Sequence, residues 1–256
     1  MQKIHLVIPA RYKSTRLPGK PLLSIHNQPM ILWTAKKAMQ ATFADSVCVA
    51  TDDARIYQTC ADAGVRVLMT DDNHPSGTDR LAQVAKDLQF ADDDIVINMQ
   101  GDEPLVPPVL LEQVMQLLID NPDCAMATLC EPIGDMDEFL RPSVVKVVKD
   151  NANRALYFSR SPIPHDRDGA AAGQTVPNNA FRHLGLYAYR VRVLKAFTNW
   201  QQGVLEKLES LEQLRVLENG ERIAIDVAKV ALPAGVDTPA DLQRLNAMPI
   251  DEFLAY

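Results

Sequence analysis

Short runs of apolar, β-branched residues alternate along the chain with stretches in which apolar residues recur at helical spacing. The apolar runs show no polar alternation, which is typical of strands covered on both faces of a parallel sheet. Strand-like runs occupy residues 4–10, 46–52, 65–69, 95–99 and 124–130, and helix-like stretches occupy residues 29–40, 54–63, 78–90 and 109–119. Strands that alternate with helices predict an α/β fold.

The pattern changes after residue 140. Residues 144–150 and 154–160 are strand-like and flank Asn151-Ala152-Asn153, which predicts an antiparallel hairpin. Further strands are expected at residues 183–190 and 222–232, and helices at residues 191–197, 205–217 and 238–246. We therefore predict a mostly parallel, Rossmann-like sheet with helices on both faces, in one domain that spans residues 1–256.

Residues 141–190 are predicted to form an antiparallel insertion in that domain. Its aromatic segments, LYF and LYAY, favour pairing with a second copy in a homodimer. The alternative is that these aromatic side chains pack on their own domain.

Composition limits the class of protein. Of the 256 residues, 47% are apolar and 23% are charged, which excludes a disordered chain and a small disulfide-dependent scaffold. The apolar runs are much shorter than the roughly 20 residues that cross a bilayer, so no membrane span is expected. The first residues lack the features of a secretion or transit signal, and a cytoplasmic location is the expectation. The cysteines form no CxxC pair and are expected to be buried and reduced; they are Cys48, Cys60, Cys124 and Cys130.

Charge is distributed unevenly along the sequence. The net charge of −7 argues against binding to nucleic acid. The first 44 residues contain seven Lys and Arg and no Asp or Glu, which gives +7 and leaves −7 − 7 = −14 for the remainder. A local cationic region on an acidic protein predicts a small anionic ligand.

The loop after the first strand supplies much of that positive charge. After Pro9-Ala10 the sequence continues RYKSTRLPGKP, with four cations, two hydroxyls and one glycine. Ligands bind at the carboxyl ends of strands in open α/β sheets. A triphosphate needs fixed cations and close backbone approach, which Gly19 allows. The loop matches neither GxxxxGK[ST] nor GxGxxG. We interpret it as a triphosphate site; the alternative is a solvated basic loop.

Two acidic residues are candidates for a metal site. Asp102 follows the strand at residues 95–99 and is predicted to lie in the same cleft. Asp237, in GVDTP, could complete the site from the opposite side. Mg²⁺ takes one or two carboxylates together with phosphate oxygens and water. The alternatives are a turn acid at position 102 and a helix-capping acid at position 237. The acids at residues 92–94 precede the strand and are expected to form a solvated turn.

The segment Ser76-Gly77-Thr78-Asp79-Arg80 opens a predicted helix. Hydroxyls and free N–H groups at a helix start can bind an anion or the polar edge of a base. A plain N-cap explains the same residues equally well.

Taken together, these segments resemble the sugar-activating cytidylyltransferases, and among them the family that uses 3-deoxy-manno-octulosonate (Kdo). The resemblance covers nearly the whole chain, except for the final MPIDEFLAY. It rests on segments in the family order: IPARYKSTRLPGKPL, ATDD, SGTDRLAQV, VINMQGDEP, VVKVVKD, ALYFSRSPIP, RHLGLYAYR, LEQLRVLENG and GVDTPADL.

The resemblance implies roles for individual residues. It implies that Lys20, Asp102 and Asp237 are catalytic and that the two aspartates bind Mg²⁺. The implied nucleotide-binding residues are Ala10, Arg11, Ser14, Thr15, Arg16, Lys20, Arg80 and Gln100. The implied sugar-binding residues are Arg160 and His183 for the carboxylate, and Tyr187 and Glu212 for the hydroxyls.

The implied reaction converts CTP and Kdo to CMP-Kdo and pyrophosphate, for lipopolysaccharide biosynthesis. The C2 hydroxyl would attack the α-phosphorus in line, with Mg²⁺ lowering the pKa of that hydroxyl. A second Mg²⁺ with Lys20 would stabilise the leaving group. One alternative is a nucleotide-sugar glycosyltransferase, although a DxD motif is missing. Another is an inactive nucleotide sensor, against which the intact acids argue.

Overall fold

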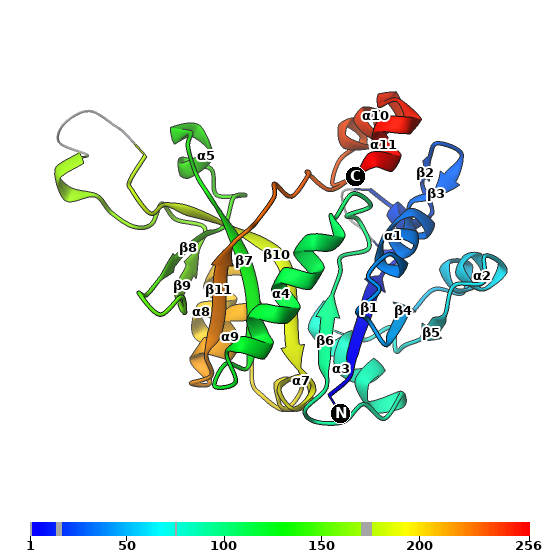
Figure 1. Ribbon diagram of the computed structural model, residues 1–256, viewed down its shortest axis with the longest axis horizontal. Coiled ribbons are helices and arrows are strands. Elements are labelled where there is room, and N and C mark those ends of the chain that lie inside the picture. The colour runs from blue at the N-terminus through cyan, green and yellow to red at the C-terminus, as the bar shows by residue number, and fades with distance from the viewer. Residues whose placement is uncertain (1, 14–16, 75, 170–175) are drawn as a thin grey trace.

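A single central sheet organises the protein in the computed structural model, which describes residues 2–13, 17–74, 76–169 and 176–256 (Figure 1). The strand order is β11-β7-β10-β6-β1-β4-β5; in addition, β8 pairs with β10, and β9 pairs with β8. The main strands are β1 (Ile4–Ala10), β4 (Ser46–Thr51), β5 (Val67–Met69), β6 (Ile95–Asn98), β7 (Met126–Pro132), β10 (Phe181–Arg190) and β11 (Ile223–Val227).

Most neighbouring strands in this sheet run in the same direction. β1 pairs in parallel with β4 and β6, β4 with β5, and β7 with β11. β10 lies antiparallel between β6 and β7. The prediction of a mostly parallel α/β sheet is therefore confirmed, with one antiparallel strand in its middle.

Helices cover both faces of the sheet and bury its two sets of side chains. Leu6 and Ile8 of β1 belong to one core cluster, and Val7 between them belongs to the other. This alternation follows from the two-residue period of a strand. The first cluster contains apolar residues of α1 (Met30–Met39), α2 (Ala54–Asp62) and α4 (Pro108–Asp120); the second contains those of α3 (Gly77–Asp87), α7 (Val191–Phe197) and α9 (Gln213–Glu218).

The prediction of one continuous helix at residues 205–217 is wrong. The structure has α8 (Val204–Glu209) and α9 instead. Between them Ser210 adopts a left-handed conformation with φ 52°. Helices commonly end at a residue in this conformation, and Ser210 is the C-terminal cap of α8. The break directs residues 210–213 toward the cavity described below.

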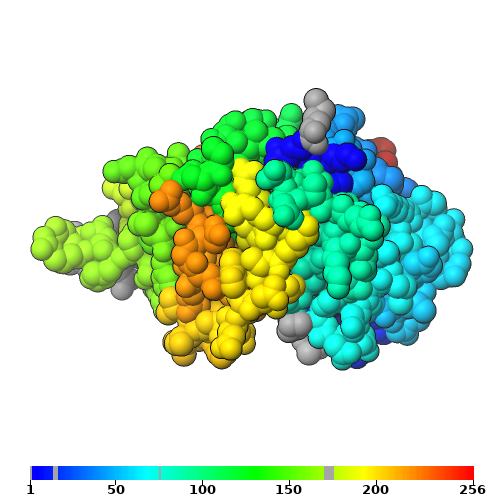
Figure 2. All heavy atoms as spheres, turned by 90° about the horizontal axis from the view of Figure 1, so that it is seen from below, coloured from blue at the N-terminus to red at the C-terminus, as the bar shows by residue number. Residues whose placement is uncertain are grey.

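The predicted hairpin after residue 140 is confirmed. β8 (Lys146–Lys149) and β9 (Ala155–Ser159) pair antiparallel. With α5 (Met136–Leu140) and the described residues up to 169 they form a projection, called the arm below, that extends from one end of the molecule (Figures 1 and 2). β10 belongs to the central sheet, so the range 141–190 includes more than this arm. That this range forms a dimerising insertion stays a prediction.

The C-terminal helices pack against the segment that follows the first loop. A short helix η1 (Lys20–Leu22) and the small pair β2 (Ser24–Ile25) and β3 (Gln28–Pro29) follow the first loop. α10 (Pro239–Ala247) and α11 (Ile250–Ala255) lie beside β2 and β3 (Figure 1). The sequence did not predict α11. Among the described residues, no helix combines the length and apolar character that a bilayer crossing requires.

Candidate functional site

The strand order reverses at β1, because β4 lies on one side of it and β6 on the other. Loops that leave neighbouring parallel strands in opposite directions open a crevice at their carboxyl ends. Here the crevice receives the loop after Ala10 and the loop after Asn98. Gly101 passes against β1 so closely that a Cβ atom there would lie 2.8 Å from the carbonyl oxygen of Pro9. Only glycine allows this approach without movement of the backbone.

Three charged side chains from distant parts of the sequence meet at this edge. Lys20 Nζ donates to Asp102 Oδ2 over 2.6 Å and to Asp237 Oδ1 over 3.1 Å. The lysine side chain is 11% exposed, whereas the two carboxylate side chains are 35% and 51% exposed. The structure therefore brings all three predicted catalytic residues together and leaves both aspartates open to a ligand.

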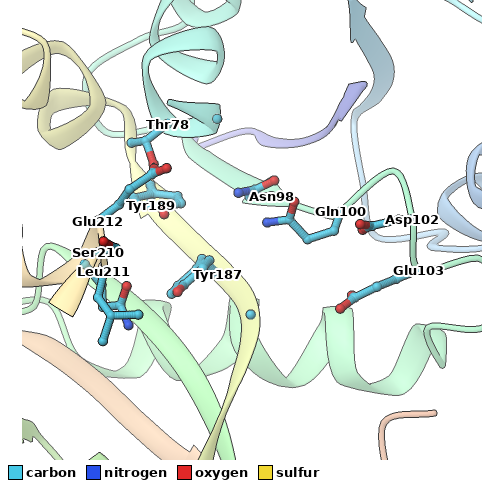
Figure 3. A pocket seen from close by; sticks show the side chains of 13 residues that line it. Thr78, Asn98, Gln100, Asp102, Glu103, Tyr187, Tyr189, Ser210, Leu211 and Glu212 are labelled. Carbon is cyan, nitrogen blue, oxygen red and sulfur yellow. The ribbon is translucent and has the colours of Figure 1, made fainter. Parts of the chain in front are cut away.

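A cavity of about 400 Å³ extends from Asp102 across the carboxyl end of the sheet. This volume suits a small-molecule ligand. Its walls come from the loops after β6 and between α8 and α9, and from β10 and the start of α3 (Figure 3). The lining side chains include Thr78, Asn98, Gln100, Asp102, Glu103, Tyr187, Tyr189, Leu211, Glu212 and Gln213.

Glu103 is an acid of this cavity that the sequence did not single out. Its Oε2 has no contact with solvent and no hydrogen-bond partner among the described residues. Desolvation, and secondarily the nearby Asp102 and Asp237 carboxylates, raises the pKa of Glu103 to about 8, against the opposing effect of Lys20. A carboxyl with this pKa is mostly protonated at neutral pH and can donate a hydrogen bond.

The opposite wall of the cavity combines hydroxyl, carboxylate and amide groups. Thr78 Oγ1 donates to Glu212 Oε2 over 2.8 Å, which fixes the glutamate at the cavity wall. Burial raises the pKa of the Tyr187 hydroxyl well above its ordinary value, so it stays a donor. Gln213 is 4% exposed, and its Nε2 has no hydrogen-bond partner among the described residues. The wall therefore offers both donors and acceptors to a polyhydroxylated ligand.

Two of the predicted sugar-binding residues lie outside the cavity lining. Arg160 donates to the carbonyl oxygen of Glu209 over 2.7 Å and to that of Pro142 over 3.2 Å. The His183 ring lies 3.0 Å from Thr128 Oγ1, and burial lowers its pKa to about 3. His183 is therefore neutral at physiological pH. Their contact with a sugar carboxylate stays a prediction.

Two of the predicted nucleotide-binding residues, Arg80 and Arg11, have guanidinium nitrogens that are not used in hydrogen bonds between the described residues. Arg80 is fully buried, and its Nη2 donates to Asp52 Oδ2 over 2.7 Å. Its Nε and the Arg11 Nη2 have no hydrogen-bond partner among the described residues. Arg80 is not among the residues that line the cavity. Ala10 is buried at the end of β1, Gln100 lines the cavity, and Ser14, Thr15 and Arg16 lie outside the described residues.

Several cavity residues were missed at the sequence level. Asn98 and Glu103 both belong to the segment VINMQGDEP, so their position in the sequence could have indicated them. Tyr189 is two residues from Tyr187 and therefore on the same face of β10. Gln213 carried no such signal, because its place depends on the break between α8 and α9.

Asp102 and Asp237 fit a divalent cation by the chemistry of their donor atoms. Both offer hard carboxylate oxygens within hydrogen-bond distance of the same ammonium group, and their exposure leaves room for phosphate and water ligands. The described residues contain no group of three or more His, Cys, Asp or Glu that could hold a metal ion. Substrate and water would therefore have to complete the coordination.

Known proteins are similar to this chain over most of its length. Residues 5–223 match the sequence model of the cytidylyltransferase family. A 3-deoxy-manno-octulosonate cytidylyltransferase from Psychrobacter sp. (strain PRwf-1) is 63% identical over 262 residues, which cover 98% of this chain and 95% of the relative. One from Acinetobacter baumannii (strain AYE) is 59% identical over 250 residues, 97% of this chain and 99% of the relative.

Two solved structures are also similar to this chain. The structure of a CMP:2-keto-3-deoxy-manno-octonic acid synthetase complexed with CTP matches with a TM-score of 0.87 at 43% identity, over 96% of this chain and 98% of that chain. A cytidylyltransferase from Leptospira borgpetersenii matches with a TM-score of 0.63 at 17% identity, over 96% of this chain and 86% of that chain, and supports the fold alone.

Proposed function

Because the chain belongs to the cytidylyltransferase family and is therefore a nucleotidyltransferase, we propose that it transfers CMP from CTP to the C2 hydroxyl of Kdo. The products are CMP-Kdo and pyrophosphate. The proposal is supported by the names of the relatives and by the CTP complex of the similar solved protein. In this proposal the C2 oxygen forms a bond to the α-phosphorus, the bond from that phosphorus to the β-phosphate bridge breaks, and the hydroxyl proton is released.

One observation carries the proposal: Lys20 contacts both Asp102 and Asp237, and Asp102 lines a polar cavity. Lys20 and Asp237 themselves are not among the lining residues. The ammonium group has three protons, and two of them go to these carboxylates, which leaves one for a phosphate oxygen. A fixed positive charge beside the reacting phosphate stabilises the charge that develops on the leaving pyrophosphate.

The remainder of the cavity accounts for a second, polyhydroxylated substrate. Glu212 can accept hydrogen bonds from sugar hydroxyls, while the Tyr187 hydroxyl can donate one. Both lie across the cavity from Asp102 (Figure 3). A sugar held between them has the aspartates at its other side, so its reactive hydroxyl is brought toward the phosphate.

We assign Mg²⁺ to Asp102 and Asp237. When bound, this ion supplies Lewis-acid chemistry, by neutralising phosphate charge and lowering the pKa of a coordinated hydroxyl. Asp102 and Asp237 hold it by their carboxylate oxygens, and Lys20 orients both carboxylates.

The test is a pyrophosphate-release assay with CTP, Mg²⁺ and a panel of sugar acids. We expect release with Kdo and identification of CMP-Kdo among the products. Release of CMP without a sugar conjugate, or CTP binding without turnover on any sugar acid, would contradict the proposed transfer.

We also propose that the protein is a homodimer, formed through the arm. Leu140 and Leu156 of the arm are 52% and 59% exposed, which leaves apolar surface uncovered in the single chain. Covering exposed apolar side chains with a second chain removes them from water, which is favourable. The aromatic side chains of LYF and LYAY do not contribute to this exposed apolar surface, because Phe158 and Tyr189 are buried in the second core cluster and Tyr157 and Tyr187 pack against that cluster. These side chains pack on their own domain, which was the alternative expectation.

A further inference from the structure

Asp237 reaches the site from a segment without regular secondary structure. Between the end of β11 at Val227 and the start of α10 at Pro239, the chain forms neither helix nor strand. The sheet therefore does not fix the Asp237 carboxylate relative to Asp102. One local tie is the Val236 N–H, which donates to the Asp102 carbonyl oxygen over 2.9 Å. The C-terminal side of Asp237 needs a second support.

The two helices that follow Asp237, α10 and α11, provide such a support; we call them the C-terminal helix pair. α10 begins with a capping box between Thr238 and Asp241, and Asp241 Oδ2 also accepts from the Asp237 N–H over 3.1 Å. At the end of α10, Asn246 Oδ1 accepts from the backbone N–H of His26 over 3.0 Å. Its side-chain amide donates to the β2 backbone over 3.0 Å. The start of α10 thus holds Asp237, and its end holds the β2–β3 turn.

α11 adds an apolar contact to the same turn. Phe253 is 1% exposed, and its ring packs edge-on against His26 and Trp33, with 5.1 Å between ring centroids in each case. His26 and Asn27 have φ values of 46° and 60°. Positive φ at both residues is the geometry of a two-residue hairpin turn, and the Phe253 ring contact and the Asn246 hydrogen bond tie this turn to the C-terminal helix pair.

Phe253 belongs to an apolar cluster, three other members of which are close in sequence to Lys20, Asp102 and Asp237. Leu17 lies three residues before Lys20, Leu105 three residues after Asp102, and Val236 directly before Asp237. These three residues and Phe253 belong to one buried cluster, which is separate from the two core clusters of the sheet. The cluster therefore joins the three segments that carry the site, and the last segment of the chain closes it.

We propose that Phe253, through the C-terminal helix pair, is the positioning residue that fixes Asp237 against Asp102 and Lys20. Phe253 touches no substrate in this scheme and acts through the place of Asp237. The inference rests on the proposed function, because it takes Asp237 as a cation ligand. It assigns a role to the C-terminal segment, for which the sequence offered none.

The experiment measures cation binding by the full chain rather than turnover. Mn²⁺ serves as the spin probe in an electron paramagnetic resonance titration with CTP present, and Phe253→Ala is compared with the wild type. We expect the apparent Kd for Mn²⁺ to rise about tenfold, as when an outer-shell partner of a metal ligand is removed. Phe253→Leu should restore part of the affinity. Leu254→Ala is the matched control, since Leu254 is on the same helix but 53% exposed, and it should bind like the wild type.

The outcomes separate the two proposals. If the wild type binds no Mn²⁺, the metal role in the proposed function is overturned, and the inference with it. If the wild type binds Mn²⁺ and Phe253→Ala binds equally well, the inference alone is overturned. If thermal unfolding shows that Phe253→Ala does not fold, Asn246→Ala replaces it, because it breaks the hydrogen bonds of the helix pair without opening an apolar cavity. Unchanged Mn²⁺ affinity in that variant would also overturn the inference.

Discussion

At the scale of single residues, the site depends on charges that only the fold brings together. Lys20 contacts two aspartates that are 82 and 217 positions away in the sequence. Each ion pair is partly exposed, so its contribution to stability is small. The arrangement is therefore better explained by ligand binding than by the stability of the fold.

We expect Asp102→Asn to reduce kcat/KM for CTP about 100-fold or more, because the amide offers a cation a weaker ligand and removes one charge next to Lys20. Steady-state kinetics and a thermal unfolding curve check this, and the unfolding midpoint should stay close to that of the wild type. Asp92→Asn is the matched control, since Asp92 pairs with Lys195 outside the cavity. Near-normal kinetics of Asp102→Asn would remove it from the proposed machinery.

Glu103 gives a prediction about pH. Its pKa is raised to about 8 in the folded protein, mainly by desolvation, whereas a glutamate in the unfolded chain titrates near 4.3. Between these values the unfolded state has lost a proton that the folded state keeps. The free energy of unfolding therefore falls as pH rises through this window. Glu103→Gln lacks this penalty, so its unfolding midpoint should exceed that of the wild type at pH 8, and the difference should shrink at pH 5. Equal midpoints at both pH values would contradict the assignment.

At the scale of elements, the ends of strands and helices place the site residues. The sequence predicted most of these elements, because apolar periodicity and caps are local signals. It failed where a local pattern was interrupted, as at Ser210, and where an element is short, as in α5 and α11. The break at Ser210 matters for function, since it lets Glu212, which the family resemblance assigned to the sugar, line the cavity.

A substitution at Gly101 tests whether the loop after β6 must lie close to the end of β1. We expect Gly101→Ala to lower the free energy of unfolding by about 1–3 kcal/mol, because its Cβ would lie 2.8 Å from the Pro9 carbonyl oxygen. Binding of CTP should weaken as well, since β1 and β6 both end there. Denaturant unfolding and calorimetric CTP titration check these effects. Gly134→Ala is the control, because a Cβ at Gly134 would have no heavy atom within 4 Å; an equal loss in both variants would count against the steric explanation.

At the scale of the whole molecule, one sheet carries both halves of the cavity. β6 supplies the loop with Asp102, and its antiparallel neighbour β10 supplies Tyr187, directly opposite Asn98. This pairing joins the proposed nucleotide and sugar sides by backbone hydrogen bonds. The outer part of the arm projects from this unit (Figure 2), whereas its strand β8 pairs with β10.

The proposed dimer is tested by light scattering coupled to size-exclusion chromatography. We expect a mass of two chains for the wild type and a shift toward one chain for Leu156→Asp, because a charge in an apolar interface is costly to bury. Leu254→Asp introduces the same charge at a leucine of similar exposure in α11 and should leave the mass unchanged. A wild type that elutes as a single chain would contradict the proposed homodimer.

The sequence by itself determined the α/β class, the order of most elements and the segments that carry the site. Strand and helix periodicity and the family motifs depend on residues that are close together in the sequence, so they can be recognised without the structure. Only the tertiary structure decided that β10 lies antiparallel between β6 and β7, that Lys20 contacts both Asp102 and Asp237, and that Glu103 Oε2 has no contact with solvent. These features arise from contacts between residues far apart in the chain, and no local pattern specifies which distant residue will be the partner. For the same reason, the packing of Phe253 behind the site was invisible in the sequence.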